Sequence, residues 1–159
     1  MSTKLSVEIS KEDVSTVVTI SGVVDESAHF DSSEIPDKSS LVLDFDGLTG
    51  INSLGIRTWV RFVNELLEKG CNFKFRNCRS IIIDQVNMVA DFAPKGTIFE
   101  SFYAPFSCDD CNSDVELLFT EKNILENDYS APKCTTCNEE MEMDALEDEY
   151  FIFLEINEG

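Results

Sequence analysis

The stretch VLDFDGLTGINSLGI, residues 42 to 56, sets the architecture of this chain, because an apolar run passes into the start of an amphipathic helix. The run LVLDF over 41–45 is nearly all apolar, as is typical of a short strand covered on both faces of a sheet. Beyond it, apolar residues recur at three- and four-residue spacing, which places them on one face of a helix. These residues are Ile56, Trp59, Val60, Val63, Leu66 and Leu67. The stretch therefore predicts a buried strand, a turn and a helix that packs on the sheet.

The start of this helix carries the polar residues Asn52 and Ser53. Either side chain can cap the helix, where the first backbone N–H groups lack partners. Ser53 can instead be a hydroxyl held out for another protein to bind or modify. Gly70 can adopt the left-handed backbone conformation that commonly ends a helix.

Strand and helix patterns continue on both sides of this unit. The segments KLSVEIS and VSTVVTISG, over 4–10 and 14–22, alternate apolar and polar residues and predict an antiparallel hairpin. Residues 71–78 are strand-like, and residues 79–92 place Ile82, Val86 and Val89 on one helical stripe. We therefore predict an α/β unit over residues 1–96, a mixed sheet with its helices on one face.

The sequence changes character after Gly96. An aromatic, strand-like segment leads into a pair of cysteines. VELLFT, over 115–120, follows as a second strand, and residues 122–133 are expected to form a polar loop. Tyr150–Ile156 is rich in aromatic and β-branched residues and predicts a third strand. Residues 97–159 are therefore expected to form a small, acidic, all-β module.

Four cysteines of this module form a metal-binding pattern, Cys108, Cys111, Cys134 and Cys137, spaced C-x2-C-x22-C-x2-C. Two intervening residues let both thiolates of a pair face one ion, and two pairs supply the four sulfurs of a structural Zn²⁺ site. Asn112 and Asn138 follow the pairs, and asparagine tolerates the positive φ that such a turn requires. A thioredoxin-like redox pair is disfavoured by the neighbouring Asp109 and Asp110, because negative charge raises a thiol pKa. Cys71 and Cys78 are expected to be buried apolar residues.

The charge of the chain is strongly negative and unevenly distributed. Formal charge is −19, and residues 108–159 carry 16 acidic and 2 basic side chains, a net of −14. Such a field repels phosphate backbones and anionic lipids, so neither nucleic acid nor a membrane is an expected partner. The acidity is either a solvated face or a docking surface for a basic partner. The segment MSTKLSVEIS lacks a secretory apolar stretch, so we expect a cytoplasmic protein.

The order of strands and helices, together with two short motifs, resembles the STAS domain of bacterial anti-anti-sigma factors over roughly residues 3 to 100. The matching motifs are Asn52-Ser53-Leu54-Gly55 at the helix start and ISGVVD, which ends in Asp25. The resemblance implies that these residues bind a regulatory protein, a serine kinase that is also an anti-sigma factor, and that Ser53 is its phosphorylation site. Two residues depart from the family pattern: Asn52 replaces an aspartate, and Leu54 replaces a second hydroxyl residue. The cysteine-rich end is similar to zinc-ribbon tails of some STAS-like proteins.

Signs of catalysis are few in this sequence. His29 lies in a polar stretch without a nucleophile motif and is expected to be exposed, and no P-loop spacing occurs among the glycines. We therefore predict no catalytic residues and a bacterial signalling adaptor, either a monomer or a weak homodimer. The alternative is a metal-handling or thiol redox protein that uses the two cysteine pairs.

Overall fold

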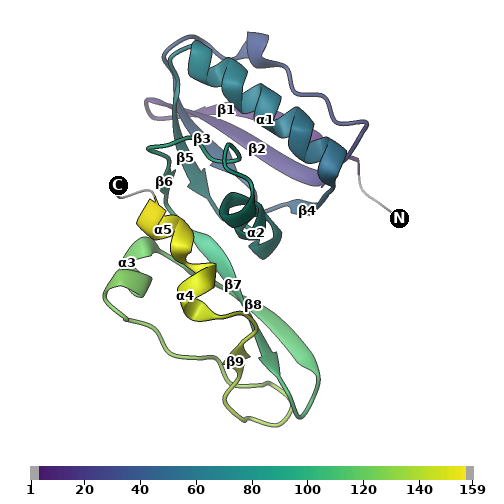
Figure 1. Ribbon diagram of the computed structural model, residues 1–159, viewed down its shortest axis with the longest axis vertical. Coiled ribbons are helices and arrows are strands. Elements are labelled where there is room, and N and C mark those ends of the chain that lie inside the picture. Colours follow the sequence, from purple (N-terminus) through teal and green to yellow (C-terminus); the bar gives the residue numbers. More distant parts are fainter. Residues whose placement is uncertain (1–3, 157–159) are drawn as a thin grey trace.

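The computed structural model describes residues 4–156 and shows a mixed α/β architecture built on a six-stranded sheet (Figure 1). Its strands are β1 (Ser6–Glu12), β2 (Ser15–Val24), β3 (Ser40–Asp44), β4 (Leu48–Ile51), β5 (Asn72–Arg76) and β6 (Ile98–Phe99). Helices α1 (Ser53–Glu68) and α2 (Ser80–Met88) lie on the same face of this sheet, and a 3-10 turn, η1 (Ser32–Glu34), precedes β3. The predicted α/β class and the one-sided helices are confirmed. Within residues 4–156, no helix combines the length and apolarity needed to cross a bilayer.

The order of the sheet is β1-β2-β3-β5-β6, and β4 pairs with the end of β2. The β1–β2 hairpin is antiparallel, as predicted, while β2, β3, β5 and β6 run parallel. The sequence did not indicate β4, which is four residues long and contains Gly50. β4 pairs in parallel with β2, and Ile51 lies opposite Val24. This pairing places the start of α1 beside the end of β2.

Of the predicted apolar stripe of α1, Leu67 is 45% exposed and does not pack on the sheet. The rest of the stripe packs on the sheet around the buried indole of Trp59. This side chain is 1% exposed, and its Nε1 donates a hydrogen bond of 3.0 Å to the backbone oxygen of Phe92. Gly70 has a φ of +80° and closes the helix as predicted. Aromatic rings surround the indole on several sides: Phe30, Phe45, Phe62, Phe75 and Phe92.

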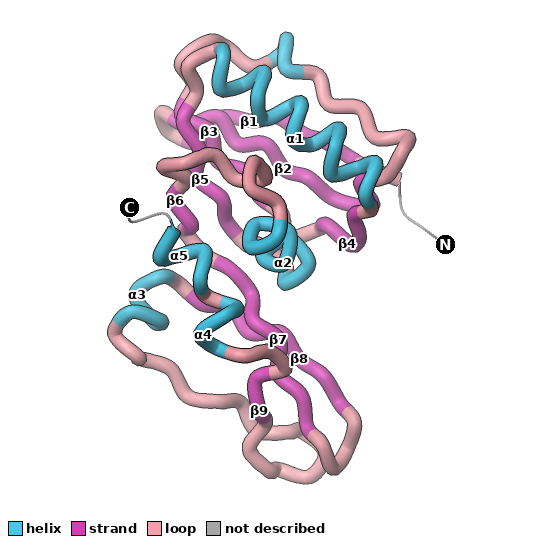
Figure 2. The backbone as a smooth tube through the Cα atoms, in the orientation of Figure 1, coloured by secondary structure: helices cyan, strands magenta, loops and turns pink. Residues whose placement is uncertain are grey.

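The cysteine-rich half forms a second sheet of three antiparallel strands in the order β8-β7-β9 (Figure 2). These strands are β7 (Phe102–Cys108), β8 (Ser113–Phe119) and β9 (Glu142–Met143), accompanied by helices α3 (Glu121–Leu125), α4 (Glu147–Tyr150) and α5 (Ile152–Ile156). Two predictions are therefore wrong: the region is not all-β, and Tyr150–Ile156 is helical rather than a strand. The buried residues are Tyr150, Phe151, Phe153 and Leu154, and the spacing i, i+1, i+3, i+4 is that of a helix buried along one side.

The two sheets are joined by backbone pairing and by a shared hydrophobic core. Beyond β6, which belongs to the first sheet, Phe102 forms a parallel bridge with Cys78, and Tyr103 N donates to Cys78 O at 2.8 Å. The ring of Phe153 contacts both Phe99 (4.8 Å between centroids) and Phe102 (5.0 Å). The predicted boundary after residue 96 thus falls just before β6, and one apolar cluster continues across it.

Candidate functional site

The four paired cysteines converge at the end of the second sheet. Cys108 is the last residue of β7, and the Sγ atoms of Cys108, Cys111, Cys134 and Cys137 all lie within 4.8 Å of one another. The Sγ atoms of Cys108 and Cys137 are 3.6 Å apart, close to the edge of about 3.8 Å that four sulfurs at 2.3 Å from one tetrahedral ion would have. None of the six cysteines forms a disulfide. Four sulfurs at this spacing can hold a metal ion.

Both cysteine pairs adopt the same backbone turn. Asn112 N donates to Cys108 O and Asn138 N donates to Cys134 O, each at 2.8 Å. The φ angles of Asn112 and Asn138 are 57° and 62°, which confirms the positive φ predicted from the sequence. The two turns therefore place the sulfurs of each pair on one side of the backbone.

Hydrogen bonding distributes the protons unequally within the cluster. Ser113 Oγ lies 3.5 Å from Cys134 Sγ, and this contact, with backbone N–H donors from the second turn, lowers the pKa of Cys134 to about 6. The neighbouring sulfur of Cys137 raises the pKa of Cys111 to about 12. Cys108 and Cys134 are buried and the other two are half-buried. A metal ion would replace the shared protons, because thiolates are the ligating form.

The residues predicted to bind a partner meet at the start of α1. Asp25 follows the end of β2, and Asn52 follows the adjacent end of β4. Ser53 is exposed, Leu54 is 51% exposed, and the Asp25 carboxylate accepts from Ser27 N and Oγ, which lowers the pKa of Asp25. The structure therefore brings Asp25, Asn52, Ser53 and Leu54 to one corner of the surface.

The helix cap is Asn52 rather than Ser53. Asn52 Oδ1 accepts from Gly55 N at 2.9 Å, and its amide donates to Glu26 at 3.0 Å. Ser53 is the first residue of the helix. Among residues 4–156, no hydrogen-bond partner of the Ser53 hydroxyl is found.

Gly55 differs from the other residues of this motif because it is buried. A Cβ atom at this position would lie 2.1 Å from Val24 O. The close approach that glycine permits is therefore made to the end of β2, inside the molecule. Gly55 positions the helix start and does not itself face solvent.

Replacing Asn52 with alanine is expected to lower the free energy of unfolding by about 1 kcal/mol, because Gly55 N loses its cap. Ser53→Ala is the matched control and is expected to change it by less than about 0.5 kcal/mol. Urea unfolding followed by Trp59 fluorescence measures both. An effect of Ser53→Ala equal to that of Asn52→Ala would show that Ser53 supports the helix.

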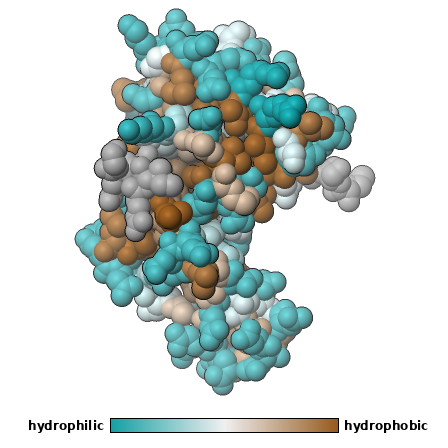
Figure 3. All heavy atoms as spheres, viewed as in Figure 1, coloured by the Kyte–Doolittle hydropathy of each residue, from teal (hydrophilic) through white to brown (hydrophobic). Residues whose placement is uncertain are grey.

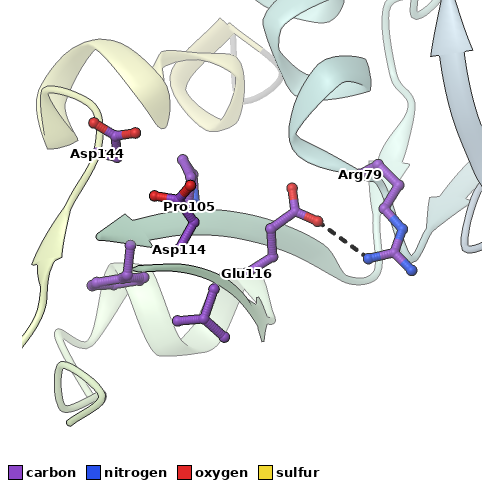
Figure 4. A pocket seen from close by; sticks show the side chains of 7 residues that line it. Arg79, Pro105, Asp114, Glu116 and Asp144 are labelled. Atoms are coloured by element: carbon purple, nitrogen blue, oxygen red, sulfur yellow. Dashed lines mark hydrogen bonds and ion pairs between the residues drawn. The ribbon is translucent and has the colours of Figure 1, made fainter. Parts of the chain in front are cut away.

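A pocket that the sequence did not indicate lies where the two sheets meet (Figure 4). It has a volume of about 480 Å³, and Figure 4 shows Asp114, Glu116 and Asp144 on the cysteine-rich side and Arg79 on the other. Arg79 Nη1 pairs with Glu116 at 3.2 Å, and Nη2 pairs with Asp46 at 3.6 Å. Glu116 also accepts from Ser80 Oγ, so this carboxylate ties the start of α2 to β8. No sequence signal could have found the pocket, because its walls come from distant segments.

No model of a known protein family matches the chain. No curated protein matches it either.

Proposed function

We propose that this protein is a non-catalytic bacterial signalling adaptor in which a STAS-like domain binds a regulatory protein through the start of α1. The observation that carries the proposal is the corner formed by the half-buried Asp25 and the exposed Asn52, Ser53 and Leu54, which gathers a carboxylate, a hydroxyl and a leucine at one helix start. Ser53 and Leu54 are both exposed, so another protein can reach them.

In this proposal the partner is a serine kinase of the anti-sigma type, and Ser53 is its substrate. Ser53 stands at the first position of α1, where the helix dipole favours a phosphate. Asp25 and Glu26 lie beside the same corner, so an added phosphate would meet two carboxylates. Phosphorylation would therefore change the charge of the binding surface and weaken a complex formed with the unmodified serine.

The cysteine cluster is proposed to hold one structural Zn²⁺ ion. Four thiolates would complete a tetrahedral shell and leave no position for a reactive water, so the ion would support folding and not catalysis. The observation in favour is the pair of matching turns at Asn112 and Asn138, which present four sulfurs from a rigid backbone. Neither membrane nor nucleic acid is a partner in this proposal, and the protein works in the cytoplasm as a monomer or weak homodimer.

The binding role is tested by site-specific photo-crosslinking in lysate of the native host. A photoreactive residue at position 54 is expected to capture one regulatory protein, and Ser53→Asp should abolish this product. The matched control places the same residue at Leu67, which is 45% exposed at the other end of α1. Equal products from positions 54 and 67 would contradict a binding corner at the helix start.

A second candidate function is metal handling or thiol redox chemistry at the cysteine pairs. It is favoured by one observation: Ser113 Oγ lies 3.5 Å from Cys134 Sγ, a contact that lowers the pKa of this thiol. The adaptor and the second candidate differ in metal exchange: a structural ion resists transfer to a chelator, whereas a cargo ion leaves readily. Exchange within seconds to a competing chelator would favour the metal-handling role.

A further inference from the structure

The outer edge of strand β8 is open. β8 is the terminal strand of its sheet and pairs only with β7 among residues 4–156. Alternate residues of such a strand point their backbone N–H and C=O groups away from the sheet, where another strand can pair with them. The sequence SDVELLF contains no lysine, proline or glycine, the residues that commonly block edge pairing. The edge is therefore competent to accept an added strand.

The two faces of β8 differ in chemistry. Asp114, Glu116 and Leu118 alternate onto one face, opposite Ser107, Pro105 and Tyr103 of β7. The other face carries Val115, which is 37% exposed, and Leu117. An added strand would therefore meet carboxylates on one face and apolar side chains on the other.

The acidic face of β8 continues into the pocket of about 480 Å³ that Arg79 and Asp144 also line. Arg79 is already paired with Glu116 and Asp46, so it does not neutralise the remaining carboxylates. Among residues 4–156, no ion pair or hydrogen bond involves the carboxylate of Asp114 or of Asp144. In Figure 3 hydrophilic residues cover most of the end of this half that lies farthest from the six-stranded sheet. The pocket beside β8 is thus suited to cationic side chains.

A second copy of the chain is a poor occupant of this edge. Residues 108–159 carry a net charge of −14, so two copies paired through β8 would place like charges against each other. A basic segment meets the opposite sign, and charge complementarity also raises its association rate.

We propose that the β8 edge is a docking site for an extended segment of a partner protein in which lysine or arginine alternates with apolar residues. The segment pairs with the β8 backbone, its basic side chains lie along Asp114 at the β8 side of the pocket, and its apolar side chains extend the Val115 face. The site lies outside the α1 corner, so it stands whether or not Ser53 is phosphorylated.

The proposal is tested with the full chain and synthetic peptides of about eight residues, slightly longer than the 7 residues of β8. A peptide that alternates Lys and Val is expected to bind and to slow amide exchange along β8 but not along β1, the edge of the other sheet. A peptide of the same composition with its lysines and valines in separate blocks is expected to bind at least about tenfold more weakly. Equal affinity of the two peptides, or unchanged β8 exchange, would overturn the proposal.

Two pairs of variants locate the site on the chain. Asp114→Asn is expected to weaken the alternating peptide about fivefold, while Asp128→Asn, at another exposed aspartate, should change affinity less than about twofold. Leu118→Lys should weaken binding similarly, whereas Leu67→Lys, at a comparably exposed leucine with the same charge change, should not. Equal losses of affinity for the two variants of either pair would show nonspecific attraction and would overturn the proposal. A dimer that Leu118→Lys abolishes would assign the edge to a second copy, which also overturns it.

Discussion

Replacing Cys137 with serine is expected to reduce the affinity of the protein for Zn²⁺ by more than about a hundredfold. Changes to groups that only support metal ligands already cost about 10–100-fold, and this change removes a ligand itself. Cys137 Sγ lies 3.6 Å from Cys108 Sγ, so its loss also opens the contact between the two turns. The affinity is measured by competition with a chromophoric chelator, and the metal content by mass spectrometry of the purified protein, where wild type is expected to hold about one ion per chain.

The matched control is Cys71→Ser, which alters another buried cysteine of the same chain. Cys71 is 6% exposed and lies outside the cluster, with its Sγ 3.8 Å from Pro36 O. This variant is expected to retain the ion. Amide exchange should accelerate in β7, β8 and β9 only in the Cys137 variant, because the turns hold the ends of these strands. Loss of metal in both variants, or a wild-type protein with no metal and freely reactive thiols, would contradict a structural ion.

Replacing Gly55 with alanine is expected to lower the free energy of unfolding by about 3 kcal/mol. The added Cβ would lie 2.1 Å from Val24 O and 2.5 Å from Val24 C, and both are backbone atoms of β2 that cannot move aside as a side chain would. Relief requires the start of α1 to shift away from the sheet, which would also disturb the Asn52 cap. Urea unfolding measures the change, and Gly50→Ala is the control.

Gly50 is suited to this comparison because an added Cβ there meets only Val23 methyl groups at 3.7 and 3.8 Å, an ordinary contact. Its replacement is expected to change the free energy of unfolding by less than about 1 kcal/mol. A small effect at both positions would show that the helix start adjusts freely. In that case, the buried position of Gly55 would not explain why glycine follows Leu54.

The sequence predicted those elements whose side chains repeat with a clear period. The β1–β2 hairpin and α1 were found because their alternation and helical stripe are long, and the two cysteine turns because Asn112 and Asn138 mark their backbone conformation. Strand β4 could not be predicted, because four residues are too few to show a period. Phe62 is buried although it lies beside the predicted apolar stripe of α1. Tyr150–Ile156 was misread because its aromatic and β-branched residues favour a strand, whereas packing against Phe99 and Phe102 favours a helix.

Some features of the candidate sites could likewise be predicted from the sequence, and others could not. The clustering of the four paired cysteines and the exposed corner at α1 could be predicted, because each follows from a short motif. The burial of Gly55 could not, since it depends on how closely α1 approaches the end of β2. The pocket beside β8 and the ion pair of Arg79 with Glu116 depend on contacts between segments far apart in the sequence.

The placement of Phe153 between Phe99 and Phe102 has a consequence for synthesis on the ribosome. During translation β6 leaves the ribosome before α5 does. Until α5 follows, the rings of Phe99 and Phe102 lack their contacts with Phe153. A ribosome-stalled chain that ends before α4 should therefore engage chaperones more strongly than one that includes α5. Folding of the amino-terminal half is in this sense completed by its carboxy-terminal neighbour.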